Sequence, residues 1–269
     1  MAELIGLSRE RVYSPGRVED DAAILAAVAA ELERRGHSVR LVDGDEEKWP
    51  NPQVGTIAFA MAQGPRSLAR MEEWQRRGIR VINAPAGILN CQRHRTVPLL
   101  NGAEVGFPAT VLVRTEAPIE PQIPPPLWVK RGDVHATDPE DVSFASDWRQ
   151  VGEALAAMRG RGVERAALQR HIDGTVIKFY GVRNGFFHPV PPSGVAGIAP
   201  SLCERLQKVA ARAARVLEVE IFGGDCVVDR AGGVHIIDLN DWPSYRACRA
   251  PAAAAIASYL IDQQTEGSL

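Results

Sequence analysis

The stretch from residue 222 to residue 245, FGGDCVVDRAGGVHIIDLNDWPSY, constrains the fold more than any other part of the chain. Two mainly apolar runs, 221–228 and 234–239, flank a turn at 229–233. That turn contains glycine and aspartate, which tolerate the left-handed backbone conformations that hairpin turns need. Apolar runs of strand length on both sides of such a turn predict a β-hairpin.

Acidic and amide side chains lie near the ends of this hairpin. Because side chains alternate between the two faces of a strand, Asp238 and Asn240 share one face of the second strand, and Asp225 on the facing strand can lie near them. Two carboxylates and an amide oxygen suit a Mg²⁺ ion that carries a nucleotide phosphate. The alternative is a turn-rich hairpin with surface acids. The apolar run before Asp238 weighs against it, since an unpaired buried carboxylate is costly.

The first 85 residues alternate strand-like and helix-like segments at short intervals. Apolar residues recur at three- and four-residue spacing from Val18 to Leu32, which indicates an amphipathic helix that ends at Gly36. This alternation predicts a small α/β domain with a largely parallel sheet. We expect strands at 3–7, 38–42, 54–60 and 79–82 and helices at 18–36 and 68–78.

The rest of the chain favours an α+β arrangement with antiparallel strand pairs. Residues 86–103 are predicted to be helical with a break near Pro98, and a proline-rich turn is expected at 121–126. We expect further strands at 110–113, 127–130, 166–169, 175–182 and 186–188 and further helices at 148–159, 202–217 and 251–263.

Composition and charge argue against several functional classes. A net charge of −2 over 269 residues gives no electrostatic footprint for nucleic acid or for an anionic membrane. No apolar run reaches the ~18 residues of a membrane span, and the first residues lack the apolar core of a signal peptide. The cysteines have no metal-ligand or disulfide spacing. We therefore expect a cytoplasmic protein that acts on a small molecule; a homo-oligomer is compatible with the sequence.

Two lysines lie at the end of or within apolar strands, where a charged ammonium group needs an anionic partner or access to water. Lys130 ends the apolar strand 127–130, where it can reach a phosphate or extend its ammonium group to water. Lys178 lies inside the apolar run 175–182. Its partner could be a substrate phosphate or a carboxylate across the sheet, and the residues alone do not decide between them.

Taken in chain order, these features resemble the ATP-grasp superfamily. The hairpin looks like the C-terminal Mg²⁺-binding signature of the family, with an acid on one strand and acid-x-Asn on the next. Lys130 looks like the lysine that touches the nucleotide phosphates. LQRHIDG (168–174) looks like the hinge that reads adenine through backbone groups, and VINAP (81–85) followed by RHRTVPLL (93–100) looks like the start of the central domain.

The resemblance covers essentially the whole chain and implies an ATP-grasp fold of the α/β and α+β classes. Its nearest branch includes ribosomal-protein glutamate ligases, glutathione synthetases and inositol phosphate kinases. The implied parts are an N-terminal parallel α/β domain at 1–90, a central lid subdomain at 91–172 and a C-terminal Mg-ATP-binding subdomain at 173–269.

The resemblance also implies which residues bind Mg-ATP. Asp225, Asp238 and Asn240 would hold Mg²⁺, with Mn²⁺ as the alternative metal. Lys130 would contact phosphate. Adenine would lie along Gln169, Arg170, His171 and Ile172, and Asp173 would meet the ribose.

Two more cations are implied to be catalytic: Lys178 would steady the transferred phosphoryl group or the acyl phosphate, and Arg93 would bind phosphate. Lys178 falls where these ligases often place an arginine, and Arg93 falls where the family often has a lysine. The chain departs from the family in having Asp rather than Glu at 238. It also has GDVHA at 132–136 where a glycine-rich loop usually covers the phosphates.

The implied reaction is phosphoryl transfer from ATP, in which positioning and charge stabilisation supply most of the rate. A carboxylate–amine ligase that forms an amide through an acyl phosphate is the first hypothesis. The alternatives are a small-molecule kinase that phosphorylates a hydroxyl group and a nucleotide-binding protein without catalysis. Residues expected near the acceptor are Tyr245, Arg246, Arg249, Arg11 and Ser14.

Overall fold

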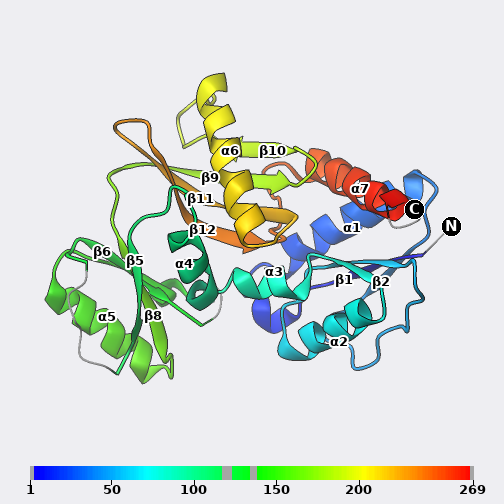
Figure 1. Cartoon of the computed structure of the whole chain (residues 1–269), viewed down its shortest axis with the longest axis horizontal. Helices are drawn as coiled ribbons and strands as arrows, with labels where there is room; N and C mark the ends of the chain where they lie inside the picture. Colours follow the sequence, from blue (N-terminus) through cyan, green and yellow to red (C-terminus); the bar gives the residue numbers. More distant parts are fainter. Residues whose placement is uncertain (1–2, 117–122, 134–137, 267–269) are drawn as a thin grey trace.

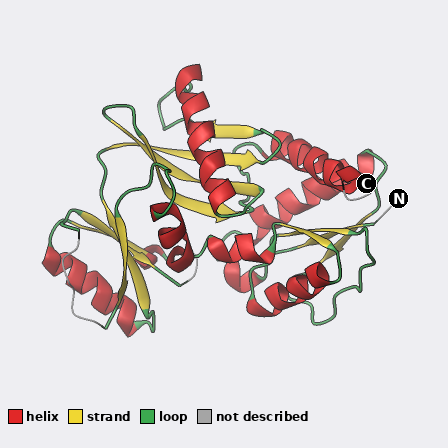
Figure 2. Cartoon of the chain, in the orientation of Figure 1, coloured by secondary structure: helices red, strands yellow, loops and turns green. Residues whose placement is uncertain are grey.

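The computed structural model describes residues 3–116, 123–133 and 138–266. They form three parts, each built on a four-stranded sheet with helices packed against it (Figures 1 and 2). The proline-rich turn expected at 121–126 and the loop at 132–136 lie partly outside the described residues.

The N-terminal sheet has the strand order β2-β1-β3-β4, and all of its strand pairs are parallel. Helices α1 and α7 cover one face, and helices α2 and α3 cover the other. Cover on both faces explains why β1 and β3 are uniformly apolar and buried. The predicted parallel α/β domain is confirmed. Its elements are β1 (Leu4–Leu7), η1 (Arg11–Tyr13), α1 (Val18–Arg34), β2 (Val39–Val42), β3 (Ile57–Ala60), α2 (Pro65–Arg76), β4 (Arg80–Ile82), α3 (Pro85–Asn90) and α7 (Arg249–Glu266).

The other two sheets are antiparallel, as predicted. The central sheet has the order β5-β8-β6-β7 and packs one face on α5, while the C-terminal sheet has the order β10-β9-β11-β12 and packs one face on α6. Helix α4 (Arg93–Asn101) connects them to the first domain. Their elements are β5 (Thr110–Arg114), β6 (Leu127–Arg131), η2 (Pro139–Asp141), β7 (Val142–Ala145), α5 (Trp148–Gly160), β8 (Arg165–Arg170), β9 (Gly174–Val182), β10 (Phe187–Val190), α6 (Pro200–Val216), β11 (Ile221–Asp229) and β12 (Val234–Asp241).

The N-terminal domain and the C-terminal sheet share one apolar core. Trp242, directly after β12, is fully buried and stacks on Phe59 of β3 with ring centroids 5.9 Å apart. The buried amide of Asn83 accepts hydrogen bonds from the backbone amides of Glu220 and Ile221 at the start of β11. These contacts attach both strands of the β11–β12 hairpin to the first domain at its open end.

Two sequence predictions are corrected. The strand expected at 54–60 begins only at Ile57, because Val54 and Gly55 form an exposed turn in which Gly55 has a φ of +94°. The helix expected at 86–103 is interrupted at Gln92 rather than near Pro98, which lies within α4. Gln92 is extended and precedes α4 as its N-cap, where the chain leaves the first domain.

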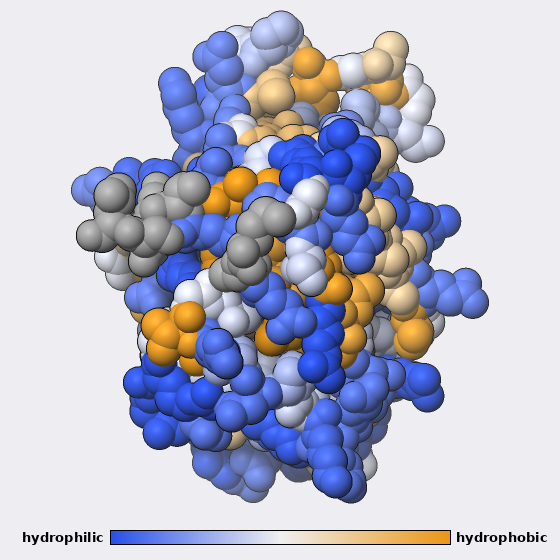
Figure 3. All heavy atoms as spheres, turned by 90° about the vertical axis from the view of Figure 1, so that its right-hand side faces the viewer, coloured by the Kyte–Doolittle hydropathy of each residue, from blue (hydrophilic) through white to orange (hydrophobic). Residues whose placement is uncertain are grey.

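Polar and charged residues cover most of the side of the molecule that carries both chain termini, with apolar residues between them (Figure 3). Of the helices in the described ranges, none combines the length and apolar character that crossing a membrane would require.

Candidate active site

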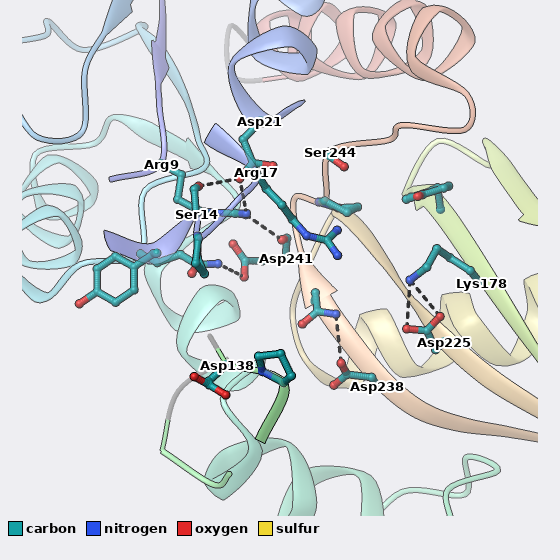
Figure 4. A pocket seen from close by; sticks show the side chains of 17 residues that line it. Arg9, Ser14, Arg17, Asp21, Asp138, Lys178, Asp225, Asp238, Asp241 and Ser244 are labelled. Atoms are coloured by element: carbon teal, nitrogen blue, oxygen red, sulfur yellow. Dashed lines mark hydrogen bonds and ion pairs between the residues drawn. The ribbon is translucent and has the colours of Figure 1, made fainter. Parts of the chain in front are cut away.

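A cavity of about 490 Å³ lies where the three parts of the chain meet (Figure 4). Its lining includes Arg9, Ser14, Arg17, Asp21 and Gln63 from the first domain, Asp138 and Pro139 from the central part, and Lys178, Tyr180, Asp225, Asp238, Asn240 and Asp241 from the C-terminal part. A cavity of this volume, lined by charged groups from three units, has the size and character of a small-molecule site.

The three predicted metal ligands lie together on one wall of this cavity. Asp225 of β11 and Asp238 of β12 are direct cross-strand partners. Asn240 follows two residues later, and its side-chain amide lies 3.4 Å from a carboxylate oxygen of Asp238. The spatial grouping expected from strand alternation is therefore present.

A β-bulge next to these acids shapes the hairpin. The strand register passes from Asp225–Asp238 to Cys226–Ile236, so it skips Ile237. The carbonyl oxygen of Ile237 accepts a hydrogen bond of 2.8 Å from the ammonium group of Lys130. This hydrogen bond links the central sheet to β12, the strand that carries Asp238 and Asn240.

Lys178 forms an ion pair with Asp225. Its ammonium nitrogen lies 2.9 Å from one carboxylate oxygen, and the two residues are register partners on β9 and β11. The Lys178 side chain is 49% exposed, so it faces the cavity rather than the core. Burial raises the pKa of Asp225, the positive charge of Lys178 opposes that rise, and the charge of Asp238 adds to it.

Lys130 is buried between the central and C-terminal sheets. Its ammonium group donates to the side-chain oxygen of Gln169 at 2.8 Å and to Ile237. Burial lowers the pKa of Lys130 to about 8; the charge of Asp238 opposes this shift and that of Arg93 adds to it. A lysine at this position can bind an anion that enters the space between the two sheets, which we call the slot.

Arg93 lies at the start of α4 and bridges the same two sheets. Its guanidinium donates to the backbone carbonyl of Arg131 at 2.9 Å and lies 3.5 Å from a carboxylate oxygen of Asp238. The two cations predicted to bind phosphate, Arg93 and Lys130, therefore converge beside the predicted metal ligands.

The slot between the two sheets is narrow. It holds about 10 Å³, room for roughly one water molecule, and its lining includes Arg93, Thr110, Lys130, Gln169, Ile237 and Asp238. An adenine ring is far larger. A nucleotide can occupy this slot only if the central and C-terminal sheets move apart.

Of the predicted adenine and ribose contacts, Gln169 lines the slot. The backbone amides of Arg170 and His171 donate to the carbonyl oxygens of Ala109 and Pro126. The His171 ring accepts from the Trp128 indole at 3.1 Å and lies 3.2 Å from Asp173. Backbone contacts of Arg170 and His171 with adenine would therefore have to use their carbonyl oxygens. A backbone contact of Ile172 with adenine stays a prediction.

The first domain contributes groups that the sequence did not indicate. Arg9 pairs with Asp21 at 3.0 Å and donates to the carbonyl oxygen of Trp242 at 2.8 Å. The amide of Gln63 donates to Asp241 at 2.9 Å. Both contacts hold Asp241 and Trp242, which directly follow Asn240: Gln63 binds the Asp241 side chain, and Arg9 binds the Trp242 backbone. No local pattern signals them, because the partners are far apart in sequence.

The residues expected near the acceptor are only partly at the cavity. Ser14 lines it. Tyr245 is fully buried, and its hydroxyl donates to the carbonyl oxygen of Gly181 at 2.7 Å. Arg249 pairs with Asp20 at 2.9 Å, and neither Arg11 nor Arg246 is part of the cavity lining. Arg17, which the sequence did not single out, lines the cavity instead.

The donor set fits Mg²⁺. Among residues 3–116, 123–133 and 138–266, no group of three or more His, Cys, Asp and Glu side chains forms a metal-binding cluster. Asp225, Asp238 and Asn240 offer two carboxylates and an amide oxygen. Mg²⁺ is usually bound by one or two carboxylates together with substrate phosphates and water, so these residues suit the ion as part of a nucleotide complex.

The solved structures that match almost the entire chain include two ligases. The ATP-grasp ligase PsnB complexed with minimal precursor has a TM-score of 0.68 and 12% sequence identity, with 97% of this chain and 98% of that chain covered. The D-alanine–D-alanine ligase from Bacillus anthracis complexed with ATP has a TM-score of 0.70 and 13% identity, with 100% and 97% covered. No protein-family model matches the sequence, and no curated protein is significantly similar to it. The structural likeness confirms the predicted fold.

Proposed function

We propose that this chain, which has the ATP-grasp fold, is a Mg-ATP-dependent carboxylate–amine ligase that forms an amide bond through an acyl phosphate and releases ADP. The observation that carries the proposal is the single cavity wall that holds Asp225, Asp238, Asn240 and Lys178. Both matched structures are ligases, one of them in complex with ATP, which supports a ligase and does not favour the kinase alternative.

Asp225, Asp238 and Asn240 would hold Mg²⁺. The ion would supply charge neutralisation at the phosphate oxygens of ATP. The protein side chains would bind, orient and shield the reacting groups.

Lys130 and Arg93 bind the phosphates in this proposal. Both already point at the space between the two sheets, next to Asp238. Each is buried and held by hydrogen bonds in the closed slot. When the two sheets move apart to admit the nucleotide, Lys130 would exchange its hydrogen bond to Ile237 for one to a phosphate.

Lys178 steadies the phosphoryl group as it passes to the acceptor carboxylate. Its position beside Asp225 places a positive charge on the wall of the large cavity that also holds Asp238, and Asp238 lines the slot as well. The acceptor carboxylate attacks the γ-phosphorus, the bond to the β-phosphate oxygen breaks, and ADP leaves. An amine then attacks the acyl carbon, loses a proton and displaces phosphate.

The acyl phosphate must be shielded from water until the amine arrives. The cavity lies between three parts of the chain, and Asp138 and Pro139 of the central part form one side of it. The central part that opens the slot for ATP would also close over the acceptor. A cytoplasmic location, a small-molecule substrate and a homo-oligomeric state stay predictions.

The proposal is tested by ADP release from purified protein with Mg-ATP. One pool contains amino acids and small carboxylates, and a second contains sugars and polyols. We expect ADP release with the first pool, together with a new amide detected by mass spectrometry. ADP release with the second pool alone, together with a phosphorylated hydroxyl compound, would identify a kinase instead.

A further inference from the structure

The charged side chains on the wall of the large cavity are almost all paired. Asp21 binds Arg9 and Ser14, Asp225 binds Lys178, Asp238 contacts Arg93, and Asp241 binds Gln63. Asp138 accepts from the backbone amide of Glu140. Within the described part of the chain, the guanidinium of Arg17 is the charged group on this wall that has neither a hydrogen bond nor an ion pair, and Arg17 is hydrogen-bonded only through its backbone.

Arg17 is placed to bind a ligand. It immediately precedes α1, and its side chain makes no capping hydrogen bond to that helix. Figure 4 shows the side chain extending from the first domain into the cavity, toward the wall that carries Ser244 and Lys178. Its guanidinium group thus faces the wall that carries Lys178, a predicted phosphoryl-transfer residue.

The paired acids and the unpaired guanidinium of the cavity wall indicate whether the ligand is a cation or an anion. A substrate ammonium group would need a carboxylate that is not already engaged, and every described acid on the wall has a partner. A guanidinium group binds carboxylates through two parallel hydrogen bonds, and it stays charged at any ordinary pH. The unengaged charge in the cavity is therefore suited to an anion.

We infer that Arg17 binds a second carboxylate of the acceptor, so that the substrate is a dicarboxylic acid or an amino-dicarboxylic acid. This inference rests on the proposed ligase function, because one carboxylate must lie at Lys178 to be phosphorylated. The second carboxylate then extends to Arg17 of the first domain; Ser14 and Ser244 also line the cavity, and the Ser14 hydroxyl donates to Asp21. Arg17 is a specificity-determining residue in this account.

The test measures binding of matched acids in the presence of Mg-ADP. Succinate, glutarate and adipate are compared with butyrate, valerate and hexanoate, which have the same chain lengths and one carboxylate fewer. We expect at least one diacid to bind and to raise the melting temperature, and its monoacid not to. The Arg17→Gln variant should weaken diacid binding about tenfold or more, the scale of a lost charge-assisted contact. Arg17→Lys should fall between the two.

Arg40→Gln is the matched control, because Arg40 is an exposed arginine of the same domain outside the cavity lining. It should bind the diacid as the wild type does. Three results would overturn the inference: equal diacid binding by Arg17→Gln and wild type, no diacid bound more tightly than its monoacid, or a selective loss of Mg-ATP binding in Arg17→Gln.

Failure of the inference and failure of the proposed function give different results. Without a ligase activity, no amine supports ADP release, yet diacid binding and its dependence on Arg17 persist. Without a role for Arg17, the ligase releases ADP and the Arg17→Gln variant keeps the wild-type KM for its carboxylate substrate.

Discussion

The ammonium group of Lys178 lies 2.9 and 3.1 Å from the two carboxylate oxygens of Asp225. One residue is a predicted phosphoryl contact and the other a predicted metal ligand, and they face each other on neighbouring strands. The pair therefore brings the two predicted roles together at one point of the cavity wall. Removing the lysine leaves Asp225 without the positive charge that opposes the burial effect on its pKa.

Replacing Lys178 by methionine should lower kcat by about 10²–10³-fold, the usual effect of losing one group that stabilises transition-state charge. Lys178→Arg should retain more of the activity, because it keeps the charge. Since the Lys178 side chain is 49% exposed and solvent screens its charge, the free energy of unfolding should change by less than about 1 kcal/mol. Steady-state ADP release and urea denaturation measure the two effects. A kcat within twofold of wild type would remove Lys178 from the mechanism.

Replacing Asp238 by asparagine should abolish turnover and leave the fold intact. The change keeps the size of the side chain and removes one of two carboxylates from the predicted metal set, so Mg²⁺ affinity should fall. Glu72→Gln on the exposed face of α2 is a control for charge removal alone. Thermal melting and ADP release over a range of Mg²⁺ concentrations provide the readouts. Full activity of Asp238→Asn at ordinary Mg²⁺ would show that the site is misplaced.

Much of the metal wall follows from local sequence pattern. Strand alternation and the glycine-containing turn were sufficient to predict the hairpin and to place Asp225, Asp238 and Asn240 together. The bulge that skips Ile237 was not predictable, because a single extra residue depends on what the facing strand and the central sheet require.

The part of the cavity lining that comes from the first domain is positioned by contacts between segments that are far apart in sequence. Arg9 reaches the carbonyl of Trp242, 233 residues along the chain, and Gln63 reaches Asp241. Neither arrangement leaves a periodic signal, since both depend on how two finished domains fit together. For the same reason Arg17 resembled any exposed arginine until the fold placed it at the cavity.

Replacing Arg9 by methionine should destabilise the protein by about 3 kcal/mol, because it leaves the buried carboxylate of Asp21 without its cation. The double variant Arg9→Met/Asp21→Asn should cost less than the sum of the two single changes, as expected for residues in contact. Equilibrium denaturation in urea measures these free energies. Additive effects would show that the pair is not coupled.

The affinity for Mg-ATP should fall as the pH rises through about 8. Burial lowers the pKa of Lys130 to about 8, so the free protein loses this charge above that pH. The phosphates bind the protonated form, so the dissociation constant should rise up to tenfold for each further pH unit. Calorimetric titration from pH 7 to 9.5 measures it. Lys130→Arg, which stays charged, should show a flat profile, and an equal slope in both proteins would contradict this assignment.

The central claim is that an acyl phosphate forms in the cavity bounded by Asp225, Asp238 and Lys178. Hydroxylamine traps such a species: its nitrogen attacks the acyl carbon, phosphate leaves, and a hydroxamate results. With Mg-ATP, a pool of small mono- and dicarboxylates and hydroxylamine, the wild type should form hydroxamate and ADP in equal amounts, and Asp238→Asn should form neither. ADP release without hydroxamate, or no ADP with any carboxylate, would contradict the account.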